Sequence, residues 1–329
     1  MKLYYFQFVF CLKNFQKIVS FLTLLFFSCN AFSIEIFDVE KNSMVVGNIK
    51  IIKVDESETV ADIANRYNTG FQDLLIANPD AHHWSPKANS EYTIPSMYIL
   101  PQENYNGIIL NLAELRLYFY MPGSDLYENT KVITYPVGIG RLDWKTPLGE
   151  TFIKSKVKNP SWYPPKSIIL EHKERGEDLP KEVKAGPDNP LGKFALKLNV
   201  DGGYLFHGTN KKHGIGMMVS HGCIRLRNND IETIFYNSSI GTKVKIINVP
   251  IKLGFYKNFL YMEVHAFNNK EVYSNNLENL LTTENVYKPV RTVMSFLEKN
   301  PNYKIYWKNV FKAYKESTGI PVMIGRIKH

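Results

Sequence analysis

One cysteine and one histidine form the pattern in this chain that is best suited to chemistry. Cys223 ends the stretch Ser-His-Gly-Cys at residues 220–223, and His207 begins a His-Gly pair sixteen residues earlier. The thiolate is the reactive form of cysteine, and a neighbouring imidazole lowers the pKa of about 8.5 of an ordinary thiol by one to several units. We therefore predict that Cys223 is a nucleophile and that His207 is its base.

The residues beside this pair suit the same chemistry. His207 closes an apolar, strand-like run and is followed by Gly208, so its side chain is expected to project from a strand end toward the site. Gly222 permits an open backbone whose amides could bind a developing oxyanion. Ser220 and His221 could hydrogen-bond within the loop and shape it. These residues complete the predicted site.

The first 33 residues are typical of an export signal. Two lysines precede an apolar run at 18–27, which is too short to span a bilayer comfortably but has the length of a signal-peptide core. Ala31 and Ser33 supply the small residues of a cleavage site. We expect the mature chain to begin near Ile34 and to lie outside the cytoplasm.

Cleavage of that signal would leave a single cysteine. Cys11 and Cys29 lie within the signal, so Cys223 would survive as a thiol or pair between molecules. Two other interpretations of the N-terminus stay open. One is lipidation of Cys29, which the bulky Phe26 and Phe27 before it disfavour, and the other is an uncleaved membrane anchor.

The length of the chain and its net charge limit the possible architectures and partners. The chain has 329 residues and a formal net charge of +9. A mature chain of about 300 residues is too long for one compact core and indicates two or three domains. Basic and acidic residues are interleaved, which favours a solvated mixed surface over a nucleic-acid partner. A mild positive charge is also compatible with an anionic polymer such as cell wall.

Residues 49–98 predict a small module of strand, helix, helix and strand. Apolar residues recur at helical spacing after a capping box that begins at Thr59, and a similar capping signal begins at Thr69. The stretches 62–67, 77–79 and 94–95 resemble a LysM module, a fold that binds glycans containing N-acetylglucosamine. Most of its apolar positions are expected to fill the core, whereas Trp84 could stack on a sugar or plug the packing.

Strands dominate the next region, up to Val249. Runs rich in β-forming residues occur at 107–112, 115–120, 131–137, 194–198, 203–206 and 242–249. One helix is predicted to begin at Asn228 as its cap, with acidic residues in its first turn and Ile231, Ile234 and Phe235 buried. The long stretch between Gly138 and Gly192 has little periodicity and predicts a lid or a disordered loop.

Residues 105–249 resemble the catalytic domain of YkuD-type L,D-transpeptidases. That family pairs His-Gly with a later Ser/Thr-His-Gly-Cys, found here at 207–208 and 220–223, and the stretches 137–140, 146–149 and 185–192 support the likeness. Many members carry Asn two positions after the cysteine. This chain has Arg225 there, as Gram-negative periplasmic relatives do, so a role built on that Asn does not transfer.

The resemblance implies a fold, a location and an activity. It implies a mainly β catalytic domain, a YkuD-like β-sandwich with a short helix after Cys223, in the periplasm. The cysteine would attack the carbonyl between the L- and D-centres of a peptidoglycan tetrapeptide stem, releasing D-alanine, and an amine would resolve the thioester. The acceptor would be another stem peptide or an outer-membrane protein or lipoprotein.

Within that activity each site residue has an implied role. His207 would move the protons, and the Gly208 carbonyl would orient its imidazole. Amides near Gly222 and Cys223 would form the oxyanion hole, and Arg225 could pair with a substrate carboxylate or form a structural salt bridge. The reaction needs no metal or organic cofactor.

Other classes of protein remain as alternatives. A zinc site of His207, His213, His221 and Cys223 lacks a usual ligand spacing, and His213 is better explained as a structural residue. A sortase-like enzyme would carry a Thr-rich motif at the cysteine. An L,D-carboxypeptidase would use water as acceptor. A non-catalytic wall-binding protein would need an inert Cys223.

Residues 250–329 fit neither module. A strand is predicted at 259–267, amphipathic helices at 290–297 and 307–314, and a final strand at 320–324. These elements are enough for a small α+β extension. Its role is unknown, and packing against the catalytic domain is the default expectation.

Overall fold

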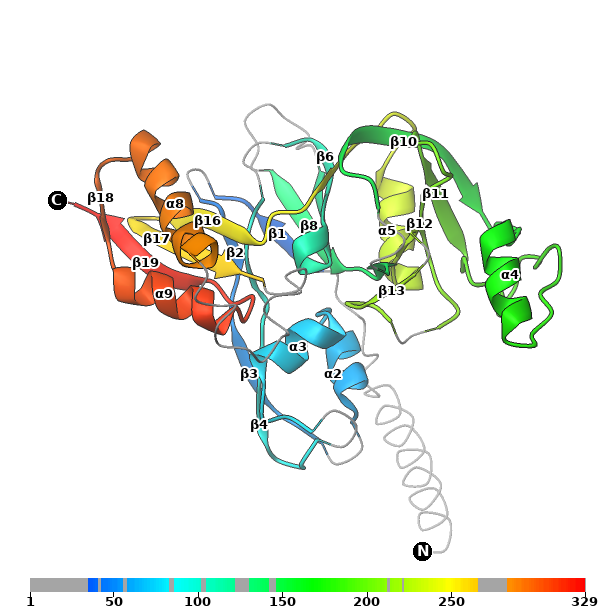
Figure 1. The fold of residues 1–329 in the computed structure, drawn as a ribbon, viewed down its shortest axis with the longest axis horizontal. Coiled ribbons are helices and arrows are strands. Elements are labelled where there is room, and N and C mark those ends of the chain that lie inside the picture. The colour runs from blue at the N-terminus through cyan, green and yellow to red at the C-terminus, as the bar shows by residue number, and fades with distance from the viewer. Residues whose placement is uncertain are drawn as a thin grey trace, which may run out of the picture. The chain divides into compact units, whose positions relative to one another are not determined.

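A computed structural model describes most of the chain (Figure 1). The described residues are 35–40, 43–55, 58–82, 86–101, 105–121, 130–141, 146–211, 214–220, 222–265 and 283–328. The predicted signal, with its two cysteines, and Trp84 lie outside them. Ile36–His329 forms one unit. None of the helices in the described ranges is both long and apolar enough to cross a membrane.

A nine-stranded sheet forms the centre of the structure. In sheet order, its strands are β1 (Ile36–Asp38), β8 (Lys131–Pro136), β7 (Arg116–Met121), β6 (Gly107–Asn111), β15 (Lys243–Ile247), β10 (Gly149–Lys158), β11 (Phe194–Leu198), β12 (Leu205–His207) and β14 (Ile224–Arg225). β9 (Ile139–Gly140) and β13 (Met218–Ser220) pair separately. The six predicted strand regions are all present, within a few residues at each end.

This sheet curls around one core rather than forming a sandwich of two separate sheets. Ile108 and Leu117 from β6 and β7 belong to the same buried cluster as Phe206 and Ile224 from β12 and β14, at the far end of the strand order. The predicted β-sandwich is therefore revised to a mixed α/β fold with a single curled sheet. Alternate residues such as Tyr118 face a second cluster on the other side.

The stretch 138–192, predicted to be a lid or disordered loop, contains regular structure. β10 and the helix α4 (Lys166–Glu174) lie within it. Ile153 is the one side chain of β10 that is buried, and three lysines, two of them exposed, interrupt any apolar pattern in the strand. Its position is fixed instead by backbone pairing with β11 and β15. An apolar pattern cannot reveal a strand held in this way.

The helix after the cysteine, α5 (Asn228–Asn237), begins where predicted but is not capped as predicted. Asn228 is its first residue, the N-cap is Arg227, and neither side chain caps the helix amides. Ile231 and Ile234 are buried against the core, and Phe235 packs against it partly buried. The Asn228 side chain is used elsewhere, as described below.

The module at 49–98 has the predicted order of elements. β3 (Lys50–Lys53), α2 (Val60–Arg66), α3 (Phe71–Ala77) and β4 (Glu91–Ile94) follow one another. Thr59 and Asp62 form the predicted capping box at α2. Thr69 does not cap α3, because the N-cap is Gly70, which makes no side-chain bond. The flanking strands β2 (Val45–Gly47) and β5 (Met97–Ile99) pair with each other.

The module contacts the region of the predicted site through Arg227. This side chain donates to the carbonyls of Ala64 and Thr69, at 3.1 and 2.9 Å, and to the Asn68 side chain at 2.9 Å. Phe71 donates its backbone amide to the carbonyl of Ile215 at 3.3 Å. The junction between α2 and α3 is thus bound to the chain just before and just after the cysteine.

The C-terminal residues form the predicted α+β unit. β16 (Ile251–Tyr256), β17 (Phe259–Val264), β19 (Val322–Ile327) and β18 (Tyr303–Ile305) make a four-stranded sheet in that order. The helices α8 (Thr283–Lys299) and α9 (Trp307–Glu316) contribute Val293 and Val310 to its core. β16 and β18 were not predicted from the sequence.

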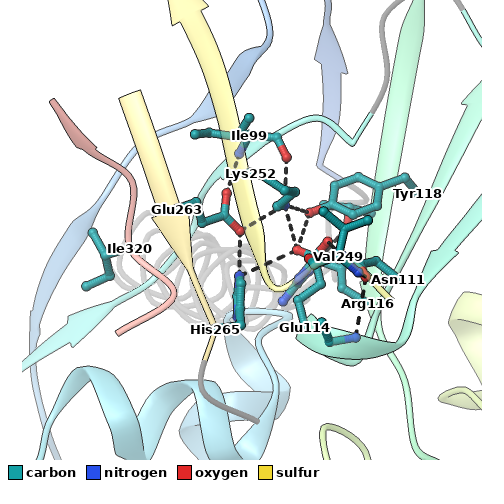
Figure 2. A network of polar contacts seen from close by, with 12 residues as sticks. Ile99, Asn111, Glu114, Arg116, Tyr118, Val249, Lys252, Glu263, His265 and Ile320 are labelled. Carbon is teal, nitrogen blue, oxygen red and sulfur yellow. Dashed lines mark hydrogen bonds and ion pairs between the residues drawn. The ribbon is translucent and has the colours of Figure 1, made fainter. Parts of the chain in front are cut away.

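A buried charged cluster joins this unit to the others (Figure 2). The Lys252 ammonium lies 2.7 Å from Glu114 of the 3-10 helix η1 (Leu112–Glu114), 2.9 Å from Glu263 and 2.6 Å from the Ile99 carbonyl. Glu263 also accepts the Ile99 amide at 2.6 Å and contacts His265 at 2.6 Å. The side-chain atoms of Glu114, Glu263 and His265 that could bind a metal ion lie within 4.8 Å of one another. The Lys252 ammonium, however, already supplies positive charge to the two carboxylates.

We predict that Lys252→Met destabilises the protein by about 3–5 kcal/mol. The substitution leaves two carboxylates, each at most 1% exposed, without their main counter-charge. Urea unfolding of Lys252→Met, with the exposed Lys308→Met as control, measures the loss. Adding Glu263→Gln should recover part of it, because one buried charge is then removed. A Lys252→Met variant as stable as the control would contradict this account.

Candidate active site

The cysteine and the histidine lie on two paired strands. β12 and β14 pair in parallel, with Phe206 opposite Ile224 and His207 opposite Arg225. Extending this register by one residue places Cys223 opposite Leu205. Side chains two residues apart share a face of a sheet, so Cys223 and His207 are diagonal neighbours on one face, together with Arg225. The fifteen residues between them thus fold back so that His207 and Cys223 stand on neighbouring segments of the chain.

The His207 imidazole is a buried neutral base. Burial lowers the pKa of His207 to about 4, the Gly208 carbonyl raises it, and the Arg225 guanidinium lowers it. Nδ1 lies 2.6 Å from the Gly208 carbonyl oxygen, which can only accept, so Nδ1 carries the ring proton. Nε2 is left with the lone pair. This is the tautomer that a base for a thiol requires.

The Cys223 thiol is protonated at rest. Burial raises its pKa, and the Leu205 amide and the Arg225 guanidinium lower it without reversing that direction. The expectation that a neighbouring imidazole lowers the thiol pKa is therefore not met. The physical reason is desolvation, which disfavours both the thiolate and the imidazolium. The resting pair is a neutral thiol beside a neutral imidazole, not an ion pair.

Arg225 is the positive charge next to both groups. Its charge lowers the pKa of His207 and of Cys223, and burial lowers the pKa of its own guanidinium. Among the described residues, no carboxylate forms a salt bridge with Arg225. The structural salt bridge considered from the sequence is therefore not seen within that part of the chain. Its effect is to favour a thiolate formed during reaction and to disfavour protonation of the base in advance.

The cysteine loop is fixed by hydrogen bonds to its carbonyls. Thr146 donates its hydroxyl to the Gly222 carbonyl at 3.1 Å, and Ser220 donates its hydroxyl to the Cys223 carbonyl at 2.5 Å. In a trans peptide the N–H points away from the carbonyl, so Thr146 also sets the direction of the Cys223 amide. Gly222 has φ of +100°, a conformation that favours glycine. These features position the amides that the sequence assigned to an oxyanion hole.

Strand β9 supports both ends of this loop. Gly138 exchanges two backbone hydrogen bonds with Arg225, at 2.9 and 2.8 Å, and Gly140 pairs with Ser220. A side chain on Gly138 would lie 2.5 Å from the carbonyl oxygen of Gly214. Glycine at 138 is therefore required for the backbones to approach this closely.

Most of the predicted site residues meet at this place. His207 ends β12 and Gly208 follows it, Ser220 ends β13, Arg225 ends β14, and Gly222 and Cys223 lie in the loop between β13 and β14. His221 and His213 lie outside the described residues. Two residues that hold the site were not predicted to do so, namely Thr146 and Asn228. Thr146 stood in a stretch noted only for its family likeness, and Asn228 was assigned to cap a helix.

A separate hollow of about 570 Å³ begins one residue beyond Thr146. It is lined mainly by 147–151 and 197–203, with Lys154 and Ile246. None of the predicted site residues lines it. It adjoins the segment that holds Gly222 but is distinct from the thiol and imidazole.

Comparison with known proteins places this geometry in context. Residues 105–246 match the model of the YkuD family, the L,D-transpeptidase catalytic domain. The chain is 46% identical over 215 residues to the Escherichia coli protein named "Probable L,D-transpeptidase YcfS", covering 64% of this chain and 66% of that protein, just under two thirds. It is 34% identical over 288 residues to "Probable L,D-transpeptidase ErfK/SrfK" of Salmonella typhimurium, covering 86% and 89%.

Solved structures give a weaker likeness. The crystal structure of L,D-transpeptidase 3 from Mycobacterium tuberculosis aligns with a TM-score of 0.31 and 16% identity, over 64% of this chain and 94% of that one. The assignment to a family rests on the sequence matches.

We predict that in Arg225→Gln the rate of Cys223 acylation begins to fall at a higher pH, on the acid side of its profile, than in the wild type. In Arg225→Lys this pH should not change. The base must be neutral to accept a proton, so the wild-type rate should hold down to about pH 4, the pKa of His207. Removing the guanidinium removes one influence that lowers this pKa. It also raises the thiol pKa further, so alkylation by iodoacetamide should need higher pH. Identical pH profiles for the two variants would refute the electrostatic role.

Proposed function

Because the chain belongs to the L,D-transpeptidase family, whose members are cysteine-dependent enzymes, we propose that Cys223 and His207 carry out its acyl transfer on peptidoglycan. The donor in this proposal is a tetrapeptide stem, cut at the bond between its L- and D-centres. The acceptor is an amine of another stem peptide or of an outer-membrane protein or lipoprotein.

Acylation begins with the neutral pair. Nε2 of His207 takes the thiol proton as Sγ of Cys223 bonds to the carbonyl carbon, because a resting thiolate is disfavoured by burial. Charge moves to the carbonyl oxygen, toward the Cys223 amide whose direction Thr146 sets. The tetrahedral intermediate collapses when His207 returns the proton to the leaving amine. D-Alanine departs and a thioester remains.

Deacylation reverses these roles. The acceptor amine attacks the thioester, His207 removes a proton from it, and the same amides hold the oxyanion. Collapse expels sulfur, which regains the proton from His207. Arg225 stabilises the sulfur each time it leaves or attacks as an anion. The observation that supports this proposal is a buried imidazole whose Nδ1 lies against the Gly208 carbonyl, at the end of a strand that pairs in parallel with the strand directly after Cys223.

Removal of the thiol should abolish both steps. We predict that Cys223→Ala and Cys223→Ser form no adduct with a carbapenem by intact mass and convert no tetrapeptide muropeptides in chromatography. Their thermal midpoints should lie close to the wild-type value, because each substitution removes or exchanges only the sulfur atom. Muropeptide turnover by Cys223→Ala close to the wild-type rate would reject the mechanism. Release of D-alanine without a cross-linked product would indicate water as the acceptor, hence a carboxypeptidase.

The location and the module belong to the same proposal. We infer that the protein works in the periplasm and that residues 49–98 form a LysM-like module bound to wall glycan. The strand-helix-helix-strand order and its core of Ile63, Leu74 and Ile94 support this inference. The junction at 68–70 is occupied by Arg227, so glycan would bind elsewhere on the module.

We predict that deletion of 49–98 weakens binding to purified sacculi, measured by pulldown. The contacts of Arg227 make a matched control possible, because Arg227→Met breaks the junction but keeps the module. Arg227→Met should therefore retain sacculus binding. Carbapenem acylation, followed by intact mass, reports any effect on the site separately. Sacculus binding that survives the deletion would exclude glycan targeting by this module.

A further inference from the structure

The side chain of Asn228 is bound to the backbone beside the base. Its Oδ1 accepts the Thr209 amide at 3.2 Å, and its Nδ2 donates to the Thr209 carbonyl at 2.9 Å. An Asn at a helix start ordinarily caps the helix's own amides, but here both polar atoms are committed to residue 209. The Asn228 side chain therefore binds the chain just after β12 and does not cap helix α5.

The peptide that Asn228 holds is the one that holds His207. The Thr209 N–H and the Gly208 carbonyl belong to one planar trans peptide group and point in opposite directions. Asn228 binds the N–H end, and His207 Nδ1 donates to the carbonyl end at 2.6 Å. Fixing one end of a rigid plane fixes the other. Hydrogen bonds in series also polarise one another.

The surrounding backbone is shaped to admit this amide. A Cβ placed on Gly192 or on Gly208 would lie 2.2 Å from Asn228 Oδ1, closer than any side chain allows. Gly192 has φ of +65°, so glycine is favoured there for a second reason. Thr209 is 8% exposed, and water therefore has little access to replace the amide. Three separate segments meet at Asn228.

We propose that Asn228 is a positioning residue that fixes the His207 tautomer through the Gly208–Thr209 peptide. This inference rests on the proposed function, in which His207 serves as base. Asn228 touches neither the substrate nor the sulfur in this scheme. Its effect is to keep the ring proton on Nδ1 and the lone pair on Nε2.

The test uses the full chain with Asn228→Ala, Asn228→Asp and the control Asn229→Ala, the same change at the exposed neighbour in the helix. Two quantities are measured: the rate of carbapenem acylation, and the His207 ring ¹⁵N shifts at pH 7, assigned by their loss in His207→Gln. The shifts distinguish the Nδ1–H from the Nε2–H tautomer, which a purely structural role would not alter.

Cys223 in Asn228→Ala should be acylated about tenfold more slowly, because the loss of one hydrogen bond of about 1.4 kcal/mol corresponds to that factor. The His207 ring of this variant should also show Nε2–H signal. Asn228→Asp keeps the acceptor for the Thr209 amide, so it should retain the Nδ1–H tautomer and most of the rate. Asn229→Ala should match the wild type in both. If Asn228→Ala fails to fold, Asn228→Asp with Nε2–H signal overturns the proposal by itself.

Two further results would each overturn the proposal. One is an Asn228→Ala protein with the wild-type acylation rate, and the other is slow acylation with an unchanged Nδ1–H tautomer. Failure of the proposed function would look different, because the wild type itself would then form no adduct on Cys223 whatever its tautomer.

Discussion

The parallel pairing of β12 with β14 is the contact on which the site depends. It joins the strand that ends in His207 to the strand that starts after Cys223, and it places both side chains on one face. A parallel pair needs a crossover, and here the crossover includes β13, which returns along β9. Gly138, just before β9, allows the backbone to pair closely with Arg225, and Gly140 in β9 pairs with Ser220. Geometry near the sulfur is thus set by backbone contacts.

Burial then decides the chemistry of the pair. In water an imidazole beside a thiol can form an ion pair, but here desolvation disfavours both charges, and Arg225 disfavours a charged imidazole further. The thiol is activated only as its proton is transferred. Such a site would be less reactive toward oxidants and stray electrophiles than a resting thiolate.

The strands around the site could be predicted because each leaves a local pattern, while the roles of Cys223 as nucleophile and His207 as base stay predictions. Cys223 and His207 lie in short motifs, and the strands β6, β7 and β11 are apolar runs. β10 was not predicted because lysines interrupt its apolar pattern and because its pairing partners, β11 and β15, are distant in sequence. Asn228 was assigned the capping role that its type and position favour. Only the fold shows that the Thr209 backbone competes successfully for the same side chain. The thiol pKa could not be predicted either, since it depends on burial.

The buried Lys252 has a consequence for how the chain reaches its native state. Glu114, a residue of the catalytic region, finds its counter-charge at Lys252, and Glu263 finds one backbone partner at Ile99, 164 positions earlier. In a chain emerging from its amino end, Glu114 would therefore lack this counter-charge until Lys252, 138 positions later, has followed. Contacts so far apart close late and slowly. Final packing around Glu114 would thus wait for the C-terminal unit.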